Sequence, residues 1–456
     1  MKLWYQRLLY VTFFLVFLVA TPLVALYTAG YRYNATKRVF EKTGILVVDS
    51  LPHRAEVYVN DRLMGTTPTR LTRLLPQTYR VRVALSGYST WEQELAVKSN
   101  LTTFSKNVVL FKKTLPVLTT EGTLNLLTVA PNRTLLIYSL LKDDREEIWL
   151  RNLNSGTDFL VETLNRSTYN RLDFVAWSPS QHAALLRQVT GDFNTYLIIN
   201  TETGQTRELF DVTRLSFDDI GWDQKNDELL YGLRKLVLYQ INLATNTVSS
   251  IAAGHLDDFL VRGRDLYSIT TVAKESFLNH MTLGSETAAE EKIKLPSPSS
   301  YTLQPAPDHL LALLDLKSND LFVISTTAFA SRAIDERIAL QAKAKAIVWS
   351  NDWQKLLFYT DFEIWVYDLK RNQKIFINRL GKVIEEAFWY PERSYVIYRT
   401  DNTLRATETE EGSVKNDTEL TSLSAISQPA VDRSGARLYF NGKVGNRQGL
   451  YQLTVQ

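Results

Sequence analysis

The side chains that could do chemistry are few in this chain, and their spacing matches no common catalytic pattern. The 456 residues contain no cysteine, so disulfides, thiolate metal ligands and cysteine nucleophiles are excluded. Motifs for a serine hydrolase, a zinc peptidase, a dinucleotide site, a phosphate loop and a calcium loop are all missing. The five histidines are scattered, and we interpret them as ordinary turn or surface residues: His53, His182, His255, His280 and His309. We predict no catalytic residue, no metal site and no cofactor.

Acidic pairs are the remaining candidates for chemistry. Three of them lie between apolar runs, Asp143-Asp144, Asp218-Asp219 and Asp257-Asp258. A glycosidase places two carboxylates on either side of the bond that it cleaves, so carboxylates converging from separate turns would suit that reaction. Paired aspartates in turns are more often solvated, because their short side chains bind the turn backbone. We prefer that interpretation and keep a hydrolase or lyase as the alternative function.

Composition bounds the partners of the protein. Lysine plus arginine (52) nearly balances aspartate plus glutamate (49), and a net charge of +3 gives no reason to expect nucleic acid. The hydrophobic share of 45% and the charged share of 22% are those of a globular protein. The length exceeds what one core usually holds, which predicts several domains or a repeat array.

An apolar segment lies near the amino terminus. Residues 8–30 carry no charge, and tyrosine and tryptophan crowd both ends, as expected at membrane interfaces. We predict a transmembrane helix rather than a cleaved signal peptide, because we see no convincing cleavage site. A buried soluble helix is the third possibility. Cations are more frequent after the segment than before it, but long domains translocate largely regardless of charge, so we expect the folded mass outside the cytoplasm.

A compact all-β unit follows a short linker. Strand-like runs at 45–48, 55–59, 79–83 and 91–97 are separated by turn residues such as Asn60-Asp61. In 79–83 strict alternation puts Tyr79, Val81 and Val83 on one face and Arg80 and Arg82 on the other. We predict a small β-sandwich over residues 44–111.

These residues resemble the PEGA domain. The resemblance rests on Gly44-Ile-Leu-Val-Val-Asp-Ser-x-Pro52, Ala55-Glu-Val-Tyr-Val-Asn60, Gly65-Thr-Thr-Pro68, Leu75-Pro76, Tyr79-x-Val81 and Gly87-Tyr88-x-x-Trp91. Three usual glycines are replaced, so the corresponding turns are expected to differ in shape, since glycine alone enters positive φ freely. The resemblance implies a spacer or binding module of prokaryotic envelope proteins, which supports the placement outside the cytoplasm.

Arginines give this unit a basic face. We interpret them mainly as a solvated strand surface, and name them as candidates for contact with anionic wall polymers or headgroups, together with one aromatic residue. These surface-binding candidates are Arg54, Arg62, Arg70, Arg73, Arg80, Arg82 and Tyr88. Tyr88 and Trp91 could stack on sugars, but residues that flank a strand more often belong to the core.

The rest of the chain repeats one pattern at a period of about 40 to 45 residues, which is the spacing of four-stranded propeller blades. In residues 346–369, three short strands are separated by two turns. The turn after the first strand recurs at Pro131, Pro179, Asp223, Gly263, Pro307, Asn351, Pro391 and Asp432. Trp349 aligns with Trp177, Trp222 and Trp389, and Trp365 with Trp149, so we interpret these tryptophans as blade-packing residues.

The repeat predicts eight blades, with seven as the alternative because 256–295 is the most degenerate copy. The last copy lacks a fourth strand, and the run 115–119 before the first copy could supply it and close the ring. Helix propensity in 335–346 is overridden by the period. The array resembles bacterial WD40-like propellers of the TolB type through the turn Trp177-Ser178-Pro179-Ser180.

Together these features predict a mainly β protein: a tail (1–7), a transmembrane helix (8–30), a linker (31–43), a PEGA-like sandwich (44–111) and a propeller (112–456). We expect a non-enzymatic, single-pass cell-membrane protein that contacts the bilayer through residues 8–30. Its expected partners are a cell-wall polymer or an envelope protein. The binding site should lie in turns that do not repeat, because what recurs in every blade serves the scaffold.

Overall fold

The computed structural model describes residues 3–191, 193–284, 291–327, 337–391, 395–410 and 415–456. These residues form two compact units, one made of residues 1–113, 410–418 and 456 and the other of 114–409 and 419–455. Residues 1–2 of the predicted tail and residues 335–336 of the segment with helix propensity lie outside the described part. Each unit is presented by itself below.

The first unit begins with a long apolar helix, α1 (Leu3–Thr28). By length and composition it can cross a membrane: an 18-residue window within residues 4–28 has a mean hydropathy of 2.4, and none of that window is buried. The helix starts earlier than the predicted 8–30 because the polar residues before Leu8 are also helical. It ends at Thr28, and Gly30 then takes a positive φ of 86°, which a side chain would strain.

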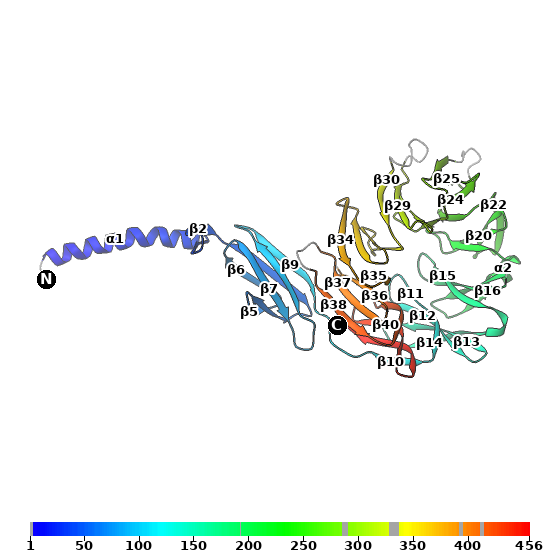
Figure 1. Ribbon diagram of the computed structural model, residues 1–456, viewed down its shortest axis with the longest axis horizontal. Coiled ribbons are helices and arrows are strands. Elements are labelled where there is room, and N and C mark those ends of the chain that lie inside the picture. Colours follow the sequence, from blue (N-terminus) through cyan, green and yellow to red (C-terminus); the bar gives the residue numbers. More distant parts are fainter. Residues whose placement is uncertain (1–2, 192, 285–290, 328–336, 392–394, 411–414) are drawn as a thin grey trace. The chain divides into compact units, whose positions relative to one another are not determined.

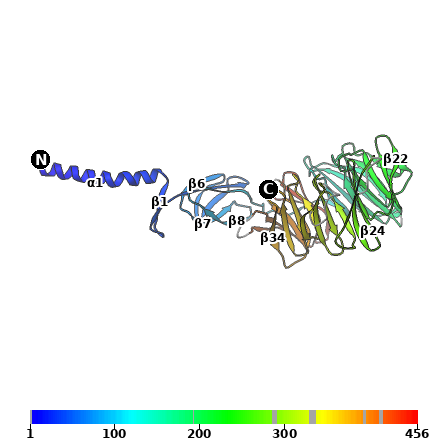
Figure 2. The same ribbon diagram turned by 90° about the horizontal axis from the view of Figure 1, so that it is seen from above.

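A β-hairpin follows the helix directly, in the segment expected to be a linker (Figure 2). Strands β1 (Tyr31–Asn34) and β2 (Val39–Lys42) form a separate two-stranded sheet. The Asn34 side chain accepts hydrogen bonds from the backbone N–H groups of Thr36 and Lys37, which fixes the turn between the strands.

The predicted sandwich is present as two facing sheets. One has the order β6-β3-β9 and the other β5-β4-β7-β8. The strands are β3 (Gly44–Leu51), β4 (Glu56–Val59), β5 (Arg62–Thr66), β6 (Thr69–Leu74), β7 (Gln77–Ala84), β8 (Trp91–Val97) and β9 (Thr102–Val109).

Alternation along these strands builds the core of the sandwich. Tyr79, Val81 and Val83 of β7 are buried against Trp91 of β8, while Arg80 points outwards, as predicted. The Asn60-Asp61 turn keeps the left-handed backbone of the usual glycine turn, with φ of 50° and 64°. Asparagine and aspartate tolerate that conformation because their short side chains bind the local backbone.

The second unit is a β-propeller of eight four-stranded antiparallel sheets, so the prediction of eight blades is confirmed (Figure 1). Numbered along the chain, blades 1 to 4 comprise β11 (Thr123–Val129), β12 (Leu135–Lys142), β13 (Arg145–Asn152), β14 (Asp158–Asn165); β15 (Arg171–Trp177), β16 (Ala183–Thr190), β17 (Phe193–Asn200), β18 (Thr206–Glu208); β19 (Asp219–Trp222), β20 (Leu229–Arg234), β21 (Val237–Asn242), β22 (Thr247–Ala253); and β23 (Asp258–Arg262), β24 (Asp265–Val272), β25 (Glu275–Thr282), β26 (Glu291–Lys294). Blades 5 to 8 comprise β27 (Tyr301–Gln304), β28 (Leu310–Asp315), β29 (Asp320–Ser325), β30 (Ile338–Lys343); β31 (Ala346–Trp349), β32 (Lys355–Tyr359), β33 (Glu363–Asp368), β34 (Gln373–Arg379); β35 (Ile384–Trp389), β36 (Tyr395–Thr400), β37 (Thr403–Glu408), β38 (Asp417–Ser422); and β39 (Ala425–Val431), β40 (Arg437–Val444), β41 (Arg447–Thr454), β10 (Val117–Glu121). The described part of this unit also contains a short helix, α2 (Leu209–Thr213), and a 3-10 turn (Arg166–Thr168).

The ring closes through a strand from the start of the unit. β10 is the outer strand of blade 8 and pairs antiparallel with β41, from Val117 opposite Gln452 to Glu121 opposite Gly449. The side chain of Thr119 adds a hydrogen bond to the carbonyl oxygen of Leu450 at 2.9 Å. The predicted use of the run before the first blade is therefore confirmed.

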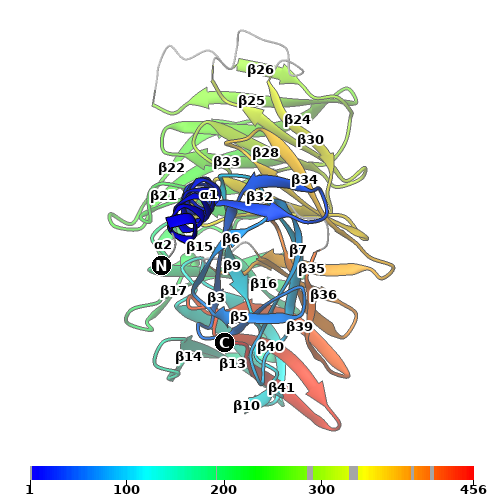
Figure 3. The same ribbon diagram turned by 90° about the vertical axis from the view of Figure 1, so that its left-hand side faces the viewer.

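The most degenerate copy is a complete blade. Blade 4 has the strand order β23-β24-β25-β26, and these strands can be followed in Figure 3. The segment with helix propensity forms the strand β30 instead, paired with β29. Tertiary pairing thus overrides local propensity at this point.

Aromatic stacking repeats between the second and third strands of several blades. Trp149 stacks on Tyr138 and Trp365 on Phe358, each with ring centroids 6.5 Å apart. Each indole N–H donates to the glutamate two residues earlier in its own strand. The alignment of Trp365 with Trp149 is confirmed by this shared environment.

Candidate ligand-binding site

The two faces of the propeller differ in what connects their strands. One face carries the turns between first and second strands, where the repeating landmarks lie; the other carries the turns between second and third strands and the connections into each next inner strand. We call this second one the B–C face. Its turns vary from blade to blade, so it is where a specific surface is expected.

A polar pocket opens on the B–C face between blades 7 and 8. Its volume is about 600 Å³, and it is lined by Arg399, Asp401, Asn402, Ala425, Ile426, Ser427, Asn441, Gly442, Lys443 and Gln448. The turn between β36 and β37 supplies one wall, and the start of β39 with the facing ends of β40 and β41 supplies the other. Sequence reasoning did not single out any of these residues.

Arg399 is one of the charged residues that line this pocket, and its side chain is 13% exposed. One terminal nitrogen donates to a carboxylate oxygen of Glu386 at 3.1 Å, and the other donates to the carbonyl oxygen of Asp401 at 3.1 Å. Its Nε–H is buried and has no hydrogen-bond partner within the described part of the chain. Glu386 also accepts the backbone N–H of Gln428, a residue at φ 52°, so both blades hold this carboxylate.

The pocket offers many hydrogen-bonding groups and few apolar ones. Asn402, Asn441 and Gln448 provide amides, Ser427 a hydroxyl, and Lys443 an exposed ammonium group. The Asn441 amide is positioned by its hydrogen bond to the Ser427 hydroxyl at 3.2 Å. Such a surface suits a hydroxylated or carboxylated polymer segment, whose many oxygens accept hydrogen bonds, better than it suits an apolar small molecule.

The acidic pairs singled out in the sequence all lie on the B–C face. Asp143-Asp144 occupies the turn between β12 and β13, and the other two pairs stand at the starts of the inner strands β19 and β23. Among the described residues no group of three or more histidine, aspartate or glutamate side chains could hold a metal ion.

Asp258, at the start of β23, is an aspartate with a raised pKa. Burial raises its pKa to about 6, although the backbone N–H groups of Leu303 and Phe259 donate to it and partly oppose that rise. The bond to Leu303 joins blade 4 to blade 5. Asp258 therefore links neighbouring blades. The negative charges of Asp219 and Asp257 also raise its pKa, by a smaller amount than burial does.

The histidines are paired with acids in separate places. His53, His182 and His255 each lie within 3.5 Å of one carboxylate on the surface. His280 lies between Asp265 and Glu291, with ring nitrogens 3.0 and 3.1 Å from their oxygens, and stacks on Tyr267. The interpretation as turn or surface residues is confirmed for His53, His182, His255 and His309, but it is wrong for His280, which lies within strand β25 and has a side chain only 18% exposed.

The structure does not gather the candidate arginines of the sandwich on one face. Arg80 and Arg82 lie on β7, Arg62 on β5 at the edge of the same sheet, and Arg70 and Arg73 on β6 of the other sheet. Arg54 lies in the turn before β4, at φ 65°. Because the two sheets face each other across the core, the arginines on them point to opposite sides of the sandwich.

Several of these arginines already have partners. Arg80 pairs with Glu92 across β7 and β8, and its hydrogen bond lowers the pKa of that carboxyl. The guanidinium of Arg82 lies 4.0 Å from the centre of the Tyr58 ring. Tyr88 is half-buried against the core of the sandwich, and Trp91 is 3% exposed, as expected of core residues.

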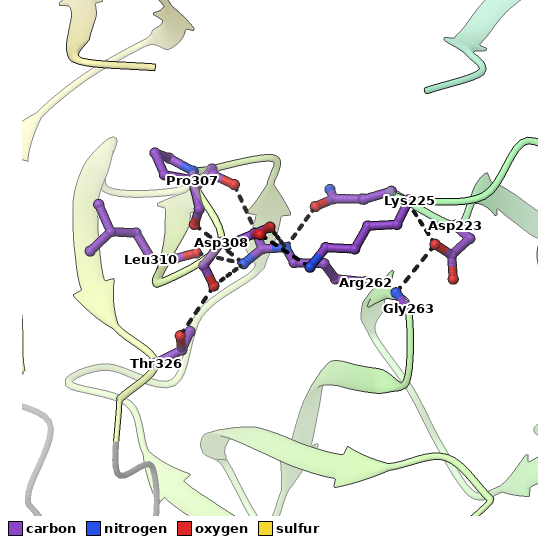
Figure 4. A network of polar contacts seen from close by, with 10 residues as sticks. Asp223, Lys225, Arg262, Gly263, Pro307, Asp308, Leu310 and Thr326 are labelled. Carbon is purple, nitrogen blue, oxygen red and sulfur yellow. Dashed lines mark hydrogen bonds and ion pairs between the residues drawn. The ribbon is translucent and has the colours of Figure 1, made fainter. Parts of the chain in front are cut away.

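A buried arginine links three blades on the opposite face of the propeller (Figure 4). Arg262, at the end of β23, donates to the carbonyl oxygens of Ala306, Pro307, Asp308 and Leu310 in the first turn of blade 5. It also donates to the Gln224 side chain of blade 3 at 3.1 Å. Burial lowers the pKa of Arg262, but the guanidinium stays positively charged at neutral pH. We interpret its contacts as structural.

Comparison with known proteins identifies the small sandwich. Residues 43–113 match the PEGA domain family, which confirms the resemblance seen in the turn residues. No curated protein matches the sequence.

Several solved structures are similar to this chain at low identity. The chain is similar to a eukaryotic initiation factor (10% identity, 83% of this chain and 97% of that chain, TM-score 0.48). It is also similar to Porphyromonas gingivalis dipeptidyl peptidase 4 (10% identity, 75% of this chain and 60% of that chain, TM-score 0.49). A third similar structure is an oligogalacturonate lyase in complex with manganese (11% identity, 74% of this chain and 98% of that chain, TM-score 0.42).

Proposed function

We propose that this protein is a non-enzymatic, membrane-tethered envelope protein whose propeller binds a cell-wall polymer or another envelope protein. The PEGA domain serves as a spacer or as a module that binds wall carbohydrate. Both folded units lie outside the cytoplasm, and nucleic acid is not a partner.

The observation that carries the tether is the solvent exposure of α1. None of its apolar window is buried in the protein. Exposing the apolar side chains of so long a helix to water would cost much free energy, and a bilayer removes that cost. Contacts at its end favour a retained anchor over a cleaved signal peptide. The guanidinium of Arg73, in the PEGA domain, lies 5.5 Å from the centre of the Tyr27 ring, so the helix end is integrated with the folded unit that follows it.

Binding through the B–C face is supported by the pocket between blades 7 and 8. Its amides, its ammonium group and the buried guanidinium of Arg399 come from the ends of β36, β40 and β41 and from the turn between β36 and β37. The ligand of this pocket is a polymer that presents many oxygen acceptors, such as a wall polysaccharide, or a protein surface of similar chemistry.

Protease treatment of intact cells tests the placement. If the propeller lies outside the cytoplasm, added protease degrades it while a cytoplasmic marker survives, and the helix remains with the membrane after alkaline extraction. A propeller that is protected in intact cells but cleaved after lysis would contradict the placement.

Pull-down of the detergent-solubilised full chain against isolated wall polymers and envelope proteins tests the binding. Replacing two pocket residues, Lys443→Ala with Gln448→Ala, should reduce capture by about tenfold, which corresponds to the loss of two hydrogen-bonding groups. Lys317→Ala, an exposed lysine in blade 5, is the matched control and should leave capture unchanged. Equal capture by both variants would contradict a role for this pocket, and release of shortened polymer would instead favour an extracytoplasmic hydrolase or lyase.

A further inference from the structure

The β1–β2 hairpin has an unusual composition for a surface element. One of its faces carries Tyr31 and Tyr33 from β1 and Phe40 from β2, since Tyr31 is opposite Lys42 and Tyr33 is opposite Phe40. The rings of Tyr33 and Phe40 are 5.4 Å apart. They are 53% and 47% exposed, so within the described part of the chain no protein surface covers this pair.

The hairpin is held firmly at the end of α1. Both the backbone N–H and the hydroxyl of Thr43 donate to the carbonyl oxygen of Gly30, at 3.0 and 2.9 Å, and close its base. Arg32 donates to the carbonyl oxygen of Tyr31, and its guanidinium lies 3.6 Å from the centre of the Tyr27 ring. An isolated two-stranded sheet is marginally stable in water, so these contacts and a further apolar contact are needed to keep it folded.

The hairpin is rich in cations, and one of them, Lys42, lies opposite Tyr31 on the aromatic face. The hairpin has four cationic residues and one acidic residue: Arg32, Lys37, Arg38 and Lys42, and Glu41. Glu41 forms an ion pair with Lys37 at 2.9 Å. Arg73 adds a further guanidinium beside Tyr27, the last aromatic residue of the helix. Exposed aromatic rings next to lysine and arginine are the composition that lies at the level of membrane headgroups.

We propose that the hairpin lies on the membrane surface, with the rings of Tyr33 and Phe40 at the boundary of headgroups and acyl chains and its cations bound to anionic phospholipid headgroups. The inference rests on the proposed insertion of α1, because that insertion places the hairpin at the bilayer surface. The apolar contact that the two-stranded sheet lacks within the protein is then supplied by lipid. The cations supply the charge complementarity that selects anionic over zwitterionic lipid.

The lack of native cysteine makes a direct test possible. The full chain is reconstituted into phosphatidylcholine vesicles with or without phosphatidylglycerol, carrying one cysteine labelled with a polarity-sensitive fluorophore. Phe40→Cys reports the aromatic face, and Val39→Cys is the matched control, because Val39 is the adjacent residue, is 46% exposed and lies on the opposite face. Val16→Cys, within the helix, reports insertion.

We expect lipids brominated near the headgroup to quench the label at residue 40 severalfold more than the label at residue 39, and more strongly when phosphatidylglycerol is present. Replacing Lys37 and Arg38 by glutamine should lower the preference for anionic vesicles by about fivefold for each cation removed. High salt should have the same effect.

Two failures are distinguishable. If lipids brominated deep in the acyl chains do not quench the label at residue 16, the helix is not inserted and the proposed anchoring is overturned. If that label is quenched but the labels at residues 39 and 40 behave alike, or do not respond to lipid charge, the hairpin inference alone is overturned.

Discussion

At the scale of single residues, the propeller uses two ways to fasten one blade to the next. Trp177, Trp222, Trp349 and Trp389 end the inner strands of four blades, and the indole N–H of Trp389 donates to the carbonyl oxygen of Val348 in the preceding blade. In blade 4 the same place is taken by Arg262 (Figure 4). A guanidinium can donate several hydrogen bonds at once, and here it satisfies four carbonyl groups of one turn.

Replacing this arginine should therefore be costly. Arg262→Ala leaves buried carbonyl oxygens without donors, and we expect the free energy of unfolding of the propeller to fall by about 3 kcal/mol or more. Arg262→Lys should restore only part of the lost free energy of unfolding, because an ammonium group cannot reproduce the planar arrangement of donors of a guanidinium. Arg264→Ala, an exposed arginine in the same turn, is the control for chemical denaturation and should change little. Equal midpoints for Arg262→Ala and Arg264→Ala would show that the network contributes nothing.

Asp258 predicts a pH dependence of stability. Its pKa of about 6 in the folded protein lies above the ordinary aspartate value near 4, so between these pH values the folded state binds more protons than the unfolded state. The stability that this group contributes is therefore fully present below about pH 4 and falls by at most about 3 kcal/mol as the pH rises through 6.

The matched measurement uses Asp258→Asn, which still accepts the hydrogen bond from Leu303. The free energy of unfolding of Asp258→Asn minus that of the native chain should be larger at pH 7 than at pH 4, because the native chain has to ionise Asp258 at pH 7 and the variant does not. Asp144→Asn, an exposed aspartate, should show no such trend. A pH-independent difference between Asp258→Asn and the native chain would refute the assignment.

At the scale of elements, the ring depends on the pairing of β10 with β41. Gly449 lies opposite Glu121 in this pair, and a Cβ atom at this position would overlap the carbonyl oxygen of Thr120 and approach Leu118 Cδ1 to 2.8 Å. The close approach of the two backbones explains why a glycine stands in the strand.

The methyl group of Gly449→Ala should push β10 away from β41. We expect a loss of about 1–3 kcal/mol in the free energy of unfolding, as for other overpacked sites, and faster amide exchange in β10. Gly221→Ala is the control, because a Cβ atom there would meet no atom within 4 Å and an inner strand gains from the change. If both variants exchange β10 amides at the native rate, the closing pair does not limit the opening of the ring.

At the scale of the whole molecule, sequence reasoning recovered the repeat and its closure but not the pocket. The period of the turn landmarks and the alternation in β7 are local signals, and both survive folding because each blade repeats the same pairing. The pocket around Arg399 depends on how the strand ends of blades 7 and 8 meet beside the turn between β36 and β37, and no spacing along the chain records that. The arginines of the PEGA domain illustrate the same limit, because their division between two sheets follows from strand order and not from alternation.

The hairpin after α1 was missed for a different reason. Its strands are short and its aromatic face is exposed, so the usual alternation of buried and solvated residues is absent from residues 31–42. The sequence reasoning treated the aromatic residues near the helix as a membrane interface, which stays a prediction, and it did not foresee their pairing into strands, which is closed by the contact of Gly30 with Thr43.

The closing strand also sets an order of events during synthesis. Thr119 and Leu450, which bind each other in blade 8, are separated by 331 residues, so β10 is made long before its partner. Until β41 emerges, β10 has no strand to pair with and the growing ring keeps an open edge at each side. A nascent chain that crosses a membrane with its amino-terminal part first would hold these edges exposed throughout export. Chaperones that shield strand edges should therefore be needed up to the last blade and released only when the ring closes.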